Sequence, residues 1–133
     1  MAQILSGDMS SIVCKENGKD YRFEPKTNET FNIDTGGIRN NDDANQKGTQ
    51  GTLLVQKNTF RGKIDGPILY SKQAYEDLVK LAESPFEQTW QFNHINGTQY
   101  VSVGGGIIVG DIQADSNAGT IQLMVAASKF RVI

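Results

Sequence analysis

The chain has 133 residues, of which 38% are hydrophobic, and its formal net charge is −2, so it suits one domain without the Lys and Arg excess typical of nucleic-acid-binding proteins. The single cysteine, Cys14, excludes an internal disulfide, and no second cysteine is present to complete a zinc motif. The opening residues lack a signal-peptide pattern and no apolar run reaches the length of a membrane span, so we expect a soluble protein made in the cytoplasm.

The first predicted element is a β-hairpin over residues 11–23. Ile12, Val13 and Cys14 provide an apolar arm, and the dipeptide Asn17-Gly18 is the pair that a type I′ turn prefers. Charged side chains of alternating sign surround the turn, which is typical of a solvated hairpin.

A long polar segment follows at residues 36–51. It is rich in Asn, Asp, Gln and Gly and carries almost nothing apolar after Ile38. Loops of this length in a compact domain are usually functional or disordered, so we predict a long polar loop here.

Two strands and one helix are predicted next. Residues 52–56 form a short apolar run typical of a buried strand, and residues 60–66 alternate until Pro67, which is expected to end that strand or mark an edge. Residues 71–83 have helical periodicity, with Ser71 as the N-cap and Ser84-Pro85 as the stop.

The last third of the chain is again β-rich. Asn96-Gly97 predicts a second hairpin turn, Gly104–Gly106 a bulge or a close backbone approach, and residues 115–119 a further turn. An alternating strand over residues 120–127 leads to an apolar C-terminus, which is usually held by its own sheet or by a partner. The expected fold is therefore mainly β, a single domain with an antiparallel β-sandwich or barrel and one flanking α-helix.

The sequence contains few patterns that indicate catalysis or ligand binding. His94 is the only histidine, and no nucleophile elbow, P-loop or EF-hand pattern is present. The glycines at 104–106 have strand-like sequence on both sides, which excludes a dinucleotide-binding turn. We therefore predict no enzyme activity, and no catalytic, cofactor-binding or metal-ligating residue.

The segments GKIDGPI (62–68), HINGTQY (94–100) and GGGIIVGDIQADSNAGTIQLMVA (104–126) resemble the phage tail tube family, including the tubes of contractile tails. A weaker likeness extends over residues 28–46. The resemblance covers residues 52–133, and its motifs are short and glycine-based.

The resemblance implies a structural subunit of the virion tail. Such subunits form hexameric rings that stack into a hollow tube, through which DNA and the tape measure protein pass without specific binding. Sheath and baseplate proteins are the other implied partners, and no membrane or cofactor is involved.

The resemblance also suggests which residues take part in assembly. In such tubes the long loop reaches the next ring. The apolar C-terminus is a second expected subunit contact, inferred from its own residues, because such an end is usually held by its own sheet or by a partner. The loop residues are Ile38, Arg39, Asn40, Asn41, Asp42, Asp43, Asn45, Gln46 and Lys47, and the C-terminal residues are Phe130, Val132 and Ile133.

Two alternatives remain open at this point. One is a tube subunit of a secretion or contractile injection system, which would share the fold. The other is a carbohydrate-binding or adhesion module in which Trp90, Tyr100 and Tyr70 stack on sugars, although aromatic residues in strands more often belong to the core.

Overall fold

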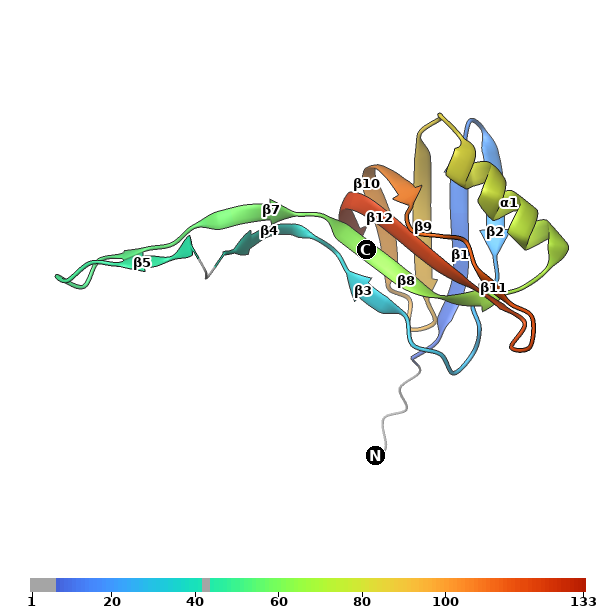
Figure 1. Cartoon of the computed structure of the whole chain (residues 1–133), viewed down its shortest axis with the longest axis horizontal. Coiled ribbons are helices and arrows are strands. Elements are labelled where there is room, and N and C mark those ends of the chain that lie inside the picture. The colour runs from blue at the N-terminus through green and yellow to red at the C-terminus, as the bar shows by residue number, and fades with distance from the viewer. Residues whose placement is uncertain (1–6, 42–43) are drawn as a thin grey trace.

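An antiparallel sheet with one helix packed against it forms the body of the protein (Figure 1). The structure, a computed structural model, describes residues 7–41 and 44–133. The eight-stranded sheet has the order β2-β1-β9-β10-β12-β8-β3, with β11 paired to β12, and in the described residues it does not close into a barrel. The mainly-β fold with one flanking helix is thus confirmed. The bounds of these elements are β1 Met9–Glu16, β2 Lys19–Phe23, β3 Asn32–Asp34, β8 Gly62–Leu69, α1 Lys72–Glu83, β9 Gln88–His94, β10 Gln99–Ile108, β11 Ala114–Asp115 and β12 Thr120–Val132.

Both predicted hairpins form. Asn17 (φ 46°) and Gly18 (φ 80°) occupy the left-handed region that a type I′ turn requires, and they join β1 to β2. Gly97, at φ 98°, lies in the four-residue connection between β9 and β10. The local turn chemistry of these dipeptides therefore sets the strand pairing around them.

The predicted bulge at Gly104–Gly106 is confirmed as well. The register of β10 shifts between Val103 and Gly106 on its β12 side. A Cβ on Gly106 would lie 2.9 Å from the Trp90 ring, so this glycine lets the strand pass close to the largest core side chain.

Pro67 does not end its strand, although a strand end at this position was one of the two outcomes expected. β8 continues to Leu69 and stays in register with β12, where Pro67 faces Gln122. The backbone N–H of Gln122 donates to Gln113, away from β8, so the ladder needs no donor from Pro67 at this position.

Helix α1 begins and ends where its sequence predicts. The Ser71 hydroxyl accepts a hydrogen bond from the Ala74 backbone N–H (3.0 Å), and the helix stops at Glu83, before Ser84-Pro85. Leu78 and Leu81 face the sheet and are fully buried. The helix thus covers the core with one apolar stripe.

An aromatic row holds the centre of the core. Trp90 lies between Phe23 and Phe92 at ring-centroid distances of 5.9 and 6.3 Å, and Phe130 packs edge-on against Phe92 at 6.2 Å. The buried Gln88 amide accepts a hydrogen bond from the Trp90 indole N–H (3.2 Å). Strands that are distant in the sequence are thereby joined across the interior.

Candidate assembly surface

A two-stranded arm leaves the body between β3 and β8 and projects away from it (Figure 1). In the middle of the arm, the Asn41 N–H donates a hydrogen bond to the Gln56 carbonyl on the opposite side (2.7 Å). At the tip, the Gly48 N–H donates to the Thr52 carbonyl (2.7 Å). With about 3.3 Å of rise per residue, the nine residues from 52 at the tip to 60 at the base give a reach of about 30 Å. The paired strands are β4 (Gly37–Asn40) with β7 (Lys57–Phe60), and β5 (Gln46–Lys47) with β6 (Leu53–Leu54).

The arm corrects two predictions. In its described residues, the segment 36–51 is one side of a β-ribbon rather than an irregular loop. The apolar run at 52–56 is not a buried strand, because it pairs with this polar side in solvent, outside the core. A short apolar run has no period that separates a core strand from an exposed one, which is why the sequence misled here.

The arm exposes apolar side chains that no other described residue of its own chain covers. Ile38 is 72% exposed, Leu54 is 64% exposed, and Leu53, Val55 and Phe60 are also exposed. An isolated two-stranded ribbon is marginally stable in water, and apolar side chains add to stability only when they are buried. The arm therefore has the properties of an element that a second molecule completes.

The base of the arm is fixed to the body. The Thr35 carbonyl accepts a hydrogen bond from the Phe130 N–H (2.8 Å), and Gly36, at φ +72°, forms a bridge to Lys129. A Cβ on Gly36 would lie 2.7 Å from the Arg61 carbonyl carbon, so only glycine fits where the two limbs cross. The direction in which the arm leaves the sheet is thus set by backbone contacts.

Asp34 braces the same base. Its carboxylate accepts hydrogen bonds from the Arg39 guanidinium and from the Gly36 N–H (3.0 Å). The hydrogen bond from Arg39 is the main cause, and that from Gly36 the second, of a pKa for Asp34 below its ordinary value of 3.8. The ion pair of Asp34 and the backbone contacts of Gly36 therefore both hold the base of the arm against the body.

The hydrogen bonds of the Asp34 carboxylate predict that the stability of the arm base decreases at low pH. The pKa of Asp34 is lower in the folded state than in the unfolded state. The contribution of its carboxylate to the stability of the folded arm base is therefore fully present above the unfolded pKa, and it is lost as pH falls through the lower folded pKa. In an NMR titration, the Gly36 amide resonance should shift with a midpoint below 3.8, and in the Asp34→Asn variant this step should vanish. A midpoint at or above 3.8 would contradict the brace.

The predicted loop residues are all on the arm as far as they are described. Ile38, Arg39 and Asn40 lie in β4, Gln46 and Lys47 in β5, and Asn41 and Asn45 in the connection between them. Asn45 accepts a hydrogen bond from the Gln56 N–H through its side chain (3.0 Å). Asp42 and Asp43 lie outside the described residues. The apolar side chains opposite, at 53–55 and 60, were missed, although the glycines at 48 and 51 signal a turn between the two sides.

The C-terminal prediction needs one correction. Phe130 is 1% exposed and belongs to the core of its own chain, so it is unavailable for a subunit contact. Val132 and Ile133 are exposed, but Ile133 exchanges two backbone hydrogen bonds with Gln99 (2.8 and 3.1 Å). The terminus is held by its own sheet, and of the three predicted contact residues only Val132 and Ile133 remain accessible.

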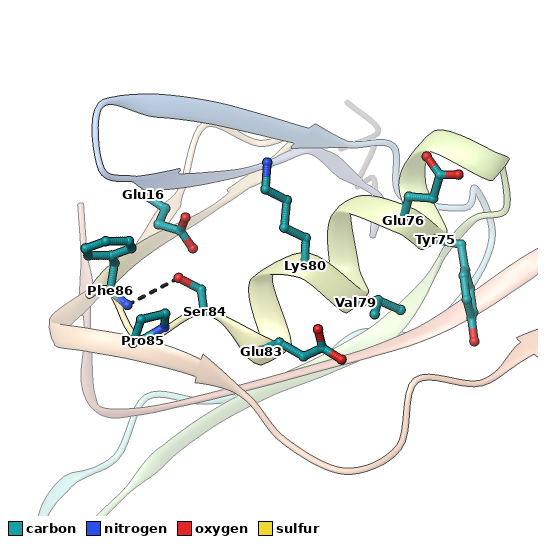
Figure 2. Close-up of a pocket in the computed structure, with 9 residues that line it drawn as sticks. All are labelled: Glu16, Tyr75, Glu76, Val79, Lys80, Glu83, Ser84, Pro85 and Phe86. Carbon is teal, nitrogen blue, oxygen red and sulfur yellow. Dashed lines mark hydrogen bonds between the residues drawn. The ribbon is translucent and has the colours of Figure 1, made fainter.

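Helix α1 lies on the opposite side of the body from the arm (Figure 1). A groove of about 550 Å³ runs along this helix (Figure 2). In Figure 2, Pro85 and Phe86 lie at one end, beside Glu16, and Tyr75 lies at the other. Phe86 is 56% exposed, and its backbone N–H donates to the Ser84 hydroxyl (3.2 Å). The groove is lined by Glu16, Tyr75, Glu76, Val79, Lys80, Glu83, Ser84, Pro85 and Phe86.

The groove is apolar inside and mostly acidic at its rim. Glu76 and Glu83 are exposed, and Glu16 is buried at the end near Phe86. The one lysine of the groove, Lys80, lies over the Tyr21 ring at 5.8 Å from its centroid. The surface therefore suits an apolar group that is flanked by positive charge.

Cys14 and His94 have structural surroundings. The His94 Nδ1 accepts a hydrogen bond from the Asn96 N–H (3.1 Å) at the hairpin turn.

Within the part of the chain that the structure describes, no group of three His, Cys, Asp or Glu side chains could hold a metal ion. The helix of this part, with 12 residues, is too short to cross a membrane.

Burial makes Cys14 unreactive, which is testable. Desolvation, with a smaller contribution from Glu16, raises the pKa of its thiol to about 12, so almost no thiolate exists at neutral pH. Iodoacetamide at pH 8 should leave the folded protein unmodified and alkylate it fully in denaturant. Rapid alkylation of the native protein would contradict this assignment.

The sugar-stacking alternative loses its main residue. Trp90 is fully buried, whereas Tyr70 is 48% exposed and packs against Tyr75. A stacking platform needs an accessible ring face, which Trp90 does not offer.

No protein-family model and no curated protein sequence matches this chain.

Proposed function

We propose that this chain is the structural subunit of a phage tail tube. It assembles into hexameric rings, and the rings stack into a hollow tube that conducts DNA. The observation that carries the proposal is the arm, an ordered ribbon whose exposed apolar side chains have no covering within the described chain.

The arm favours assembly over ligand binding for a physical reason. Its apolar side chains are spread along both strands, so a small molecule would cover only a few of them, whereas a second protein surface covers the whole length. Its reach of about 30 Å takes it away from the body from which it leaves (Figure 1). Each subunit then contacts several others, and many modest contacts add up to a stable assembly.

The remaining parts of the proposal rest on the sequence resemblance. The lumen contains DNA and the tape measure protein, and sheath and baseplate proteins are further partners in the tail of the virion. The subunit performs no catalysis. A tube subunit of a secretion or contractile injection system would use the same arm, and the neighbouring genes separate these two systems.

Negative-stain electron microscopy of the purified protein at high concentration tests the proposal. Rings or hollow tubes with six-fold symmetry are the expected result. A protein that stays monomeric at millimolar concentration would contradict it.

A further inference from the structure

We propose that the tip of the arm of one subunit docks in the α1 groove of a second copy. This inference rests on the proposed function and adds to it the surface that receives the arm. Two unlike surfaces of the same chain, the arm tip and the groove, would then meet in every contact.

The apolar chemistry of the two surfaces matches. The tip exposes Leu53 and Leu54 by 57% and 64%, and both lie in β6, the strand next to the turn. Successive side chains of a strand point to opposite faces, so Leu53 enters the groove while Leu54 lies on the other face of the arm. The groove offers Val79 and the exposed Phe86, and its volume of about 550 Å³ accommodates an aliphatic side chain. Docking therefore removes apolar surface from water on both partners.

The charges match as well. Lys47 is the Cα partner of Leu53 in the β5–β6 ladder, so the two side chains share one face of the arm. A leucine with an adjacent lysine fits an apolar groove whose rim carries Glu76 and Glu83. Neither Lys47 nor Glu83 forms an ion pair among the described residues. The rim charges orient the arm while the leucine fills the groove.

The chain cannot make this contact with itself. The arm leaves the body on the side opposite α1, and its tip points away from the helix (Figure 1). The docking must therefore join two molecules. Because the two surfaces differ, the contact is head-to-tail and repeats from copy to copy, which produces rings or filaments.

Disulfide trapping with the variants Leu53→Cys and Val79→Cys tests the contact. Cross-linking requires Cα atoms within about 7 Å, and the buried Cys14 does not interfere. The double variant should give a ladder of covalent oligomers on a non-reducing gel after mild oxidation. An equimolar mixture of the two single variants should give one heterodimer band, and each variant alone should give none. A variant that combines Leu53→Cys with Ile107→Cys, an exposed position outside the groove, is the matched control and should give no ladder.

Charge reversal provides a second measurement. Lys47→Glu should raise the protein concentration needed for assembly by about twofold to fivefold, the effect of one exposed charge pair, and adding Glu83→Lys should reverse the change. Tubes without cross-linking in the double variant, or a homodimer of the Leu53→Cys variant alone, would overturn the docking site and leave the proposed function standing. Absence of any assembly in the unmodified protein would instead contradict the proposed function.

Discussion

Removal of the outer part of the arm, residues 41–56, is expected to leave a folded monomer that no longer assembles, the arm-less variant. In the variant, residues 41–56 are replaced by Asn-Gly, which closes a two-residue turn between Asn40 and Lys57, Cα partners at the end of the β4–β7 ladder. No residue of the removed segment belongs to the described core, so the unfolding midpoint should change by only a few degrees. Electron microscopy should show neither rings nor tubes.

The design removes both sides of the arm for a reason. Deletion of residues 39–48 alone would remove the strand partners of residues 53, 54, 57 and 58 and leave the apolar run 53–55 unpaired, which promotes aggregation. A second variant keeps the ribbon and replaces only two of its apolar side chains, through Leu53→Ser and Leu54→Ser. It should also fail to assemble, because the ribbon remains but its apolar contact is lost. Long tubes formed by the arm-less variant would refute the role of the arm.

The largest loss of stability is expected from Trp90→Ala. Trp90 is fully buried between two stacked rings, and its indole N–H donates to Gln88. Truncation of such a side chain typically lowers the free energy of unfolding by about 3–5 kcal/mol, out of a total of about 5–15 kcal/mol. The variant should therefore be largely unfolded at temperatures where the parent is stable.

Urea denaturation in the arm-less background measures this loss without interference from assembly. Phe86→Ala is the matched control, because Phe86 is 56% exposed and its loss should change the free energy of unfolding by no more than about 0.5 kcal/mol. A Trp90→Ala variant that loses less than about 1 kcal/mol would show that the aromatic row does not hold the core.

Some features of the fold depend on a few neighbouring residues and could be predicted. Asn17-Gly18 fixes a hairpin because its backbone angles suit a type I′ turn, whatever surrounds it. Ser71 and Ser84-Pro85 bound the helix in the same local manner. Glycines at 104–106 signalled the bulge, although not the Trp90 ring beside it.

Other features depend on contacts between distant residues, and the pattern alone misplaced them. Phe130 and Val132 look equivalent as neighbours in an apolar terminus, yet one is buried and the other is 55% exposed. The run at 52–56 has the composition of a core strand, but its two leucines pair with Gln46 and Lys47 outside the body.

The sequence by itself therefore determined the turns, the helix and the mainly antiparallel β character of this protein, because each follows from residues a few positions apart. Only the tertiary structure decided that residues 37–41 and 44–60 belong to an arm whose apolar side chains remain in water. Burial is a property of the whole packed chain, and a hydrophobic residue carries no local mark of whether its own core or a neighbouring molecule will cover it.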